Sequence, residues 1–208
     1  MNVKIAFIGD KGVGKTSLIK AVRNMGKFTE KYRPSQGLDF YTIKKDKLVI
    51  QLWDTADDTN TFDHKDLAFR KSIDVIVVCY DSTMMETSMI PRIERWIDQF
   101  RADFPSDHVC PVIVCATKTD KEMTPLVREG LIGSHCRRSD YVHVSTSAKD
   151  EKGIEELRDG IVTQSYMSII GGLRAENERL KESAKRYAEL FHSELGSGRE
   201  AMKNTYGI

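Results

Sequence analysis

The sequence predicts an α/β fold with a six-stranded, mostly parallel sheet, helices on both faces and a C-terminal helical extension. The main observation is that short β-rich runs alternate with amphipathic stretches, which is typical of βαβ units in a sheet covered on both faces. A second observation concerns residues 38 to 53, where only a charged turn separates two strands, which indicates one antiparallel hairpin. The length of 208 residues suits one domain with a complete hydrophobic core plus an appendage.

The expected elements follow one another along the chain with short connections. The strands are expected at residues 3–8, 38–44, 48–53, 74–80, 112–116 and 141–144, and the helices at 16–24, 62–71, 87–102, 124–136 and 153–168. The pair Gly171-Gly172 interrupts the helical pattern, so we expect a separate helix from Leu173 that ends at Gly196, followed by a frayed tail. The predicted domains are therefore residues 1–168 and an extension over 169–208.

Composition limits the partners and the compartment. Lysine and arginine total 32 and aspartate and glutamate total 31, so the net charge of +1 predicts no attraction to nucleic acid or to anionic membranes. The cysteines lack metal-binding spacing and are expected to be reduced thiols; they are Cys79, Cys110, Cys115 and Cys136. The chain has no signal peptide, no glycine after Met1 for myristoylation and no apolar run near the ~18 residues of a membrane span, so we expect a cytoplasmic protein.

A phosphate-binding loop follows the first strand directly. The segment GDKGVGKTS fits the pattern GxxxxGK(S/T), at the required junction between a strand and a helix. Glycines in such a loop let successive backbone N–H groups surround a β-phosphate, while Lys15 reaches the β- and γ-phosphate oxygens and the Thr16 hydroxyl can ligand Mg²⁺. The expected nucleotide-binding residues in this loop are Gly9, Asp10, Lys11, Gly12, Val13, Gly14, Lys15, Thr16 and Ser17.

Three later segments indicate guanine as the base. Asp54, in WDTA at the end of the third strand, is the acidic residue expected to hold Mg²⁺ through water. The carboxylate of Asp120, in TKTD, can accept two hydrogen bonds from the N1–H and amino groups of guanine, which adenine cannot donate. Lys118 can lie along the base, and the Ala148 N–H in TSAK can donate to guanine O6. The base-binding set is Thr117, Lys118, Asp120, Ser147, Ala148 and Lys149.

Over residues 1–168 the sequence resembles the Ras superfamily of small GTPases, and the Rab branch in particular. Beyond the motifs above, the resemblance rests on GLDF after YRPS, on AFRKSIDVIVVCYDST and on the Trp96 helix before VIVCATKTD. It implies the small G domain fold of P-loop NTPases, bound GDP or GTP with Mg²⁺, and a role in vesicle trafficking. It also implies that Phe28 stacks on guanine and that Ser35 ligands Mg²⁺ when GTP is bound, alongside Thr16 and Asp54.

The same resemblance implies a protein-binding surface. Phe40, Trp53 and Phe69 correspond to the aromatic surface that Rab-like proteins present to effectors, within switch regions at 26–40 and 54–71. Ordinary core packing of these three aromatic side chains is the alternative.

Switch II departs from the family pattern. The family motif WDTAGQE reads WDTADDT here, so Asp57 replaces Gly, Asp58 replaces Gln and Thr59 replaces Glu. The family Gln orients the attacking water, whereas ionised Asp58 is shorter and only accepts hydrogen bonds. Lys15, which reaches the γ-phosphate oxygens, is the other residue expected to act in hydrolysis. Two charges 4 Å apart repel by about 4 kcal/mol at an effective dielectric of 20, so the aspartates also disfavour a γ-phosphate. We expect slow GTP hydrolysis and a bias toward GDP.

The sequence leaves open both the position of the Lys11 side chain and the choice between two kinds of function. The Lys11 ammonium either forms a charge cluster with Asp57 and Asp58 near the γ-phosphate, or points into solvent. The chain is accordingly either a Rab-like switch with slow hydrolysis, or a pseudo-GTPase that holds GDP or GTP constitutively and docks partners. A P-loop kinase would leave Asp120 and the TSAK segment without a purpose.

The C-terminal region also departs from the Rab pattern. The chain has no cysteine after position 136, so we expect no prenylation and no stable lipid anchor, with recruitment to membranes through partners. Apolar residues recur there at alternating spacings of four and three, with one asparagine among them; the positions are Leu173, Asn177, Leu180, Ala184, Tyr187 and Phe191. Residues 173–195 therefore either bind a partner helix or lie back on their own domain.

Overall fold

The structure, a computed structural model, describes most of the chain. The described residues are 1–24, 39–45, 47–55, 69, 71–84, 89–102, 104, 108, 110–123 and 130–206. The helix expected at 62–71 falls largely outside these residues, as does the first half of the helix expected at 124–136.

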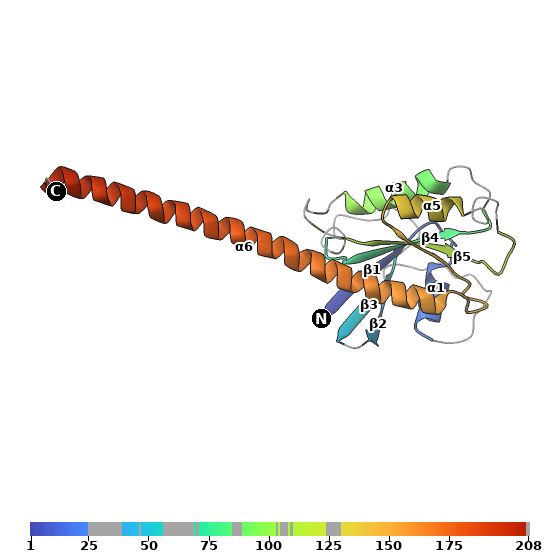
Figure 1. Ribbon diagram of the computed structural model, residues 1–208. Helices are drawn as coiled ribbons and strands as arrows, with labels where there is room; N and C mark the ends of the chain where they lie inside the picture. Colours follow the sequence, from blue (N-terminus) through green and yellow to red (C-terminus); the bar gives the residue numbers. More distant parts are fainter. Residues whose placement is uncertain are drawn as a thin grey trace. The chain divides into compact units, whose positions relative to one another are not determined.

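The predicted sheet is confirmed. Its six strands have the spatial order β2-β3-β1-β4-β5-β6 (Figure 1). They are β1 (Asn2–Ile8), β2 (Asp39–Lys45), β3 (Leu48–Asp54), β4 (Val75–Asp81), β5 (Val112–Thr117) and β6 (Val142–Ser145). The β2-β3 pair is antiparallel, with Phe40 opposite Trp53, and the other pairs are parallel. The hairpin expected between residues 38 and 53 is therefore present.

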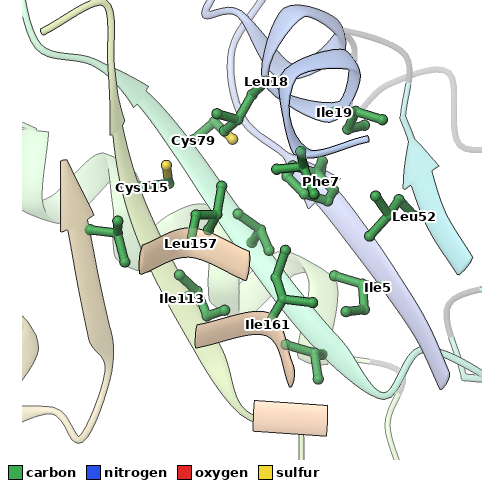
Figure 2. Packing of buried hydrophobic residues seen from close by; sticks show 14 of the residues in the cluster. Ile5, Phe7, Leu18, Ile19, Leu52, Cys79, Ile113, Cys115, Leu157 and Ile161 are labelled. Atoms are coloured by element: carbon green, nitrogen blue, oxygen red, sulfur yellow. The ribbon is translucent and has the colours of Figure 1, made fainter. Parts of the chain in front are cut away.

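The period-two alternation of strand side chains builds a separate core on each face of the sheet. Along β1, Ile5 and Phe7 belong to one core, while Ala6 and Ile8 belong to the other. The first core packs against α1 (Lys15–Val22) and the start of α6 (Ile154–Tyr206), and Figure 2 shows side chains of both helices over the strands. The second core packs against α3 (Met89–Arg101) and α5 (Leu131–Arg138). Helices thus cover both faces, as predicted.

The prediction that Gly171-Gly172 separates two helices is wrong. Helix α6 continues through both glycines from Ile154 to Tyr206, so it neither restarts at Leu173 nor ends at Gly196. Each glycine costs about 1 kcal/mol relative to alanine within a helix, and the leucine, arginine, alanine, glutamate and lysine residues that follow are strong helix formers. The chain divides into two compact units, residues 1–169 and 170–208. Within the described part of the chain, no helix has the length and apolar character needed to cross a membrane.

Candidate nucleotide-binding site

The predicted motifs lie at one edge of the sheet. The phosphate loop and TSAK follow β1 and β6, while WDTA and TKTD begin in the last residues of β3 and β5; these four strands run parallel to one another. Parallel strands present their carboxyl ends at the same edge, and ligands of open α/β sheets bind there. The topology therefore collects segments separated by more than a hundred residues in sequence.

Two glycines allow the phosphate loop to adopt its path. Gly9 has φ of 138°, and a Cβ atom there would lie 2.2 Å from the backbone oxygen of Cys79 on β4. Gly14, immediately before α1, has φ of 110°, in the region that side chains rarely adopt. The loop thus crosses β4 too closely for any side chain at Gly9, and it delivers the N-terminus of α1 to the edge of the sheet.

Lys15 is held inside the phosphate loop. Its ammonium donates to the backbone oxygens of Gly9 at 2.8 Å and Asp10 at 3.1 Å, and the residue is only 4% exposed. A cation enclosed by the loop, close to backbone N–H groups at a helix N-terminus, creates an environment that favours a bound phosphate.

Thr16 and Asp54, the two described residues predicted to hold Mg²⁺, are in direct contact. The Thr16 hydroxyl donates to Oδ2 of Asp54 at 2.6 Å, and Asp54 is 1% exposed. A hydroxyl and a carboxylate are the oxygen donors that Mg²⁺ takes, and Mg²⁺ completes its shell with phosphate oxygens and water. No cluster of three or more His, Cys, Asp or Glu side chains that could hold a metal ion occurs among the described residues. The residues present therefore fit Mg²⁺.

Asp120 is oriented by the loop after β6. The Ser147 hydroxyl donates to Oδ1 of Asp120 at 2.8 Å and accepts from the Asp150 N–H at 3.1 Å. The two loops are also joined by the Thr119 N–H, which donates to the Thr146 carbonyl at 3.1 Å. These bonds hold the carboxylate that was predicted to select guanine, and Ser147 orients it through a hydrogen bond.

Lys118 and Thr117 connect the loop after β5 to the phosphate loop. The Lys118 ammonium donates to the Gly12 carbonyl at 2.8 Å and pairs with Asp81 at 2.6 Å, and its backbone has φ of 59°. The Thr117 hydroxyl lies within hydrogen-bond distance of the Val13 carbonyl at 2.7 Å and of the Tyr80 carbonyl at 3.0 Å. Thr117 therefore contacts both the phosphate loop and the end of β4.

Some residues of the site were missed in the sequence. Arg92 forms an ion pair with Asp10 at 2.7 Å, and the Trp96 indole N–H donates to the same carboxylate at 3.3 Å. The two α3 residues are four apart and so share one helix face, which is a visible signal, but nothing in the sequence indicated that this face meets the phosphate loop. Asp81 was missed as well, although it ends a strand beside Lys118.

Against the effect of burial, the contacts of Asp81 with Lys118 and Thr83 lower the pKa of its carboxyl. Burial alone would raise the pKa of its carboxyl, but hydrogen bonds from Lys118 and Thr83 and the charge of Lys118 hold the pKa below the ordinary value. Thr83 contributes its backbone N–H at 3.0 Å and its hydroxyl at 2.7 Å. Asp81 is therefore ionised at neutral pH and keeps Lys118 in place.

Phe40, Trp53 and Phe69 form one aromatic cluster. The ring centroids are 4.7 Å apart both between Phe40 and Trp53 and between Trp53 and Phe69. Trp53 and Phe69 are partly buried against the core, whereas Phe40 is 54% exposed. Core packing thus explains the partial burial of Trp53 and Phe69, but it does not explain the exposed Phe40.

Other predicted site residues are exposed or lie outside the described residues. Lys11 and Lys149 are exposed, and Ala148 is half-buried. Phe28, Ser35, Asp57 and Asp58 lie outside the described residues, so the predicted base stacking, the switch I ligand and the proposed charge cluster with Lys11 stay predictions.

Together these loops define a phosphate-loop nucleotide-binding protein. The sequence matches the Ras family over residues 4–167, and the chain belongs to that family. It is 32% identical over 178 residues to the Ras-related protein Rab-7a of Dictyostelium discoideum, covering 77% of this chain and 86% of the relative. It is 30% identical over 203 residues to the Ypt/Rab-type GTPase ypt7 of Schizosaccharomyces pombe, covering 94% and 93%. The chain is a GTP-binding regulatory protein of the Rab-like type.

Proposed function

We propose that the chain binds GDP or GTP with Mg²⁺ and hydrolyses GTP slowly, acting as a regulatory switch or scaffold. Lys15 would contact the β- and γ-phosphates, Thr16 and Ser35 would ligand Mg²⁺, and Asp54 would hold the ion through water. Bound Mg²⁺ would neutralise phosphate charge. Residues 1–168 would carry this site, with 169–208 as an extension.

The observation that carries the proposal is the pairing of two carboxylates with hydroxyls at one sheet edge. Asp54 lies against Thr16 beside the phosphate loop, and Asp120 lies against Ser147 in the base-binding loops. A phosphate site alone is compatible with many P-loop proteins. A second, oriented carboxylate has a specific use, because it can accept hydrogen bonds from both N–H donors of guanine.

The chemistry expected of Asp58 supports slow hydrolysis. Glutamine donates toward the transition state and orients the attacking water, and both tasks need an amide at a longer reach than aspartate offers. Asp57 adds a side chain where the family has glycine, which restricts the backbone movement that accompanies loss of the γ-phosphate.

A pseudo-GTPase is the second candidate, favoured by the same Asp57-Asp58 pair. Such a protein would hold GDP or GTP constitutively and would dock partners without cycling. The aromatic cluster of Phe40, Trp53 and Phe69 supports partner binding in either case, because an exposed phenylalanine beside a tryptophan is typical of protein-binding surfaces. Recruitment to membranes in vesicle trafficking would then depend on partners bound through residues 26–40 and 54–71.

Single-turnover hydrolysis of bound GTP distinguishes the two candidates. We expect the wild type to turn over slowly and the double variant Asp57→Gly/Asp58→Gln to be faster by roughly tenfold or more, because the water-orienting amide is restored. A rate that is measurable in the wild type favours the switch, and a rate indistinguishable from free GTP favours the pseudo-GTPase. An unchanged rate in the double variant would contradict the assignment of Asp57 and Asp58.

Paired affinities for GDP and GTP test the predicted repulsion. We expect GDP to bind several-fold more tightly, because two carboxylates near the γ-phosphate disfavour it. Competition with ATP provides the specificity control. Equal affinities for GDP and GTP would indicate that Lys11 or Mg²⁺ neutralises the aspartates.

A further inference from the structure

The second half of α6 carries a row of exposed apolar side chains. Leu173 is 59% exposed, Leu180 is 63% exposed and Tyr187 is 73% exposed. Because the helix continues through Gly171-Gly172, Ile170 is in phase with this row and is exposed too. Solvent-exposed leucine and isoleucine side chains on one helix face are typical of an interaction surface.

The row has the spacing of a two-stranded coiled coil. Starting at Ile170, the steps alternate between three and four residues, which defines heptad positions a and d. Position a holds Ile170, Asn177, Ala184 and Phe191, and position d holds Leu173, Leu180 and Tyr187. Leucine at d suits a parallel two-stranded arrangement, and a single asparagine at a fixes the register by facing its own counterpart. We name these seven residues the α6 seam.

Flanking charges favour a second copy of the same chain. Glu176 occupies position g and Lys181 occupies the following position e. In a parallel, in-register pair, residue g of one helix faces the next e of the other, so Glu176 meets Lys181 of the second copy, twice by symmetry. In an antiparallel pair the e edges face each other, which brings lysine toward lysine. The charge pattern is therefore self-complementary only in the parallel arrangement.

We infer that two copies of this chain associate through the α6 seam as a parallel, in-register coiled coil. The inference goes beyond the nucleotide chemistry, because none of its residues belongs to the site. With three heptads, one asparagine and one alanine in the seam, the association is weak and reversible.

Charge reversal in the full-length protein tests the pairing. The measurement is sedimentation velocity over a concentration series, for the wild type, Glu176→Lys, Lys181→Glu and an equimolar mixture of the two variants. We expect the wild type to dimerise and each variant to dimerise roughly tenfold more weakly, since two attractions become repulsions. The mixture should regain wild-type affinity, because both pairs are opposite in charge again.

The control is Glu182→Lys, which makes the same charge change at the outward position f. It should leave the dimer unchanged. A wild type that stays monomeric at all concentrations overturns the inference. A mixture that fails to regain affinity, or a control that weakens the dimer equally, overturns it as well.

A disulfide across the seam tests the orientation. The four native cysteines are buried, so Ala184→Cys adds an exposed thiol at position a. In a parallel, in-register dimer this thiol lies opposite its counterpart, and mild oxidation should yield a covalent dimer. A dimer that forms but resists oxidation would contradict the parallel register.

Discussion

Single side chains at the nucleotide site are positioned by partners from other loops. Lys118 bridges the Gly12 carbonyl and the Asp81 carboxylate, and Ser147 orients Asp120. Such cross-loop contacts pre-arrange a site before ligand arrives, which lowers the conformational cost of binding. Substitution of a single side chain should therefore change nucleotide binding or stability in a way that can be measured separately.

Asp120→Asn should exchange the base that is preferred. An asparagine amide can accept from guanine N1–H but presents a donor toward the guanine amino group, whereas xanthine offers an acceptor there. We expect guanine-nucleotide affinity to fall by roughly a hundredfold or more, because buried polar groups become mismatched, and xanthosine diphosphate binding to rise. Competition titrations with both nucleotides measure this exchange, with Asp150→Asn as the control. Unchanged guanine affinity would contradict the role of Asp120.

Asp81→Asn should reduce stability in a manner that depends on pH. The folded pKa of Asp81 lies below its ordinary value, so its contribution is present above that ordinary value and is lost as pH falls through the folded pKa. We expect a loss of about 2 kcal/mol at neutral pH, which shrinks below about pH 4 as the wild-type carboxyl is protonated. Urea unfolding of wild type and variant at several pH values measures the loss of stability and its decrease at low pH. A difference that is independent of pH would contradict the Asp81-Lys118 pair.

At the scale of elements, α1 is fixed at both ends. Its N-terminus carries the phosphate loop, and its C-terminal carbonyls accept hydrogen bonds from Arg158 on α6, at 2.7 Å for Val22 and 3.1 Å for Ala21. The last carbonyls of a helix have no partner within the helix, so a guanidinium satisfies them. Arg158 thus couples α6 to the helix that follows the phosphate loop.

Arg158→Met should loosen this connection. Methionine keeps an apolar stem but removes all donors, so we expect a loss of about 1–3 kcal/mol in the free energy of unfolding. Arg138→Met, at the exposed end of α5, is the matched control and should change stability by less than about 0.5 kcal/mol. Urea unfolding of both variants makes the comparison, and equal effects would contradict the capping role of Arg158.

At the scale of the whole molecule, nucleotide and fold are linked. The site joins loops from four strands, so a ligand that binds only the folded chain stabilises the entire domain. A guanine nucleotide at a thousand times its dissociation constant should add about 4 kcal/mol.

Removal of Mg²⁺ should therefore lower the melting temperature. If Thr16 and Asp54 hold Mg²⁺ together with the nucleotide, as proposed, a chelator should lower the melting temperature of the GDP-bound protein by several degrees. Thermal unfolding with and without chelator measures the change, and Thr16→Ala should abolish it. A chelator effect that persists in Thr16→Ala would contradict the metal site.

Much of the architecture was predictable because local patterns set it. The alternation of β-rich and amphipathic runs predicted the sheet, and the short charged turn predicted the β2-β3 hairpin. The helix after β6 was harder to predict from sequence, since Gly171-Gly172 indicated a break that the helix formers around it override. The helix propensity of a single residue is a weak signal, but the summed propensity of the residues around the two glycines favours a continuous helix.

The sequence alone determined the motif-bearing loops and their order, because glycine spacing, a terminal carboxylate and strand periodicity are local properties. Only the tertiary structure decided which side chains support them. Arg92 on α3 reaches the phosphate loop, Asp81 at the end of β4 pairs with Lys118, and Arg158 on α6 contacts α1. Such contacts arise from how helices pack across a sheet, and a sequence pattern encodes the packing face of a helix but not the partner that this face meets.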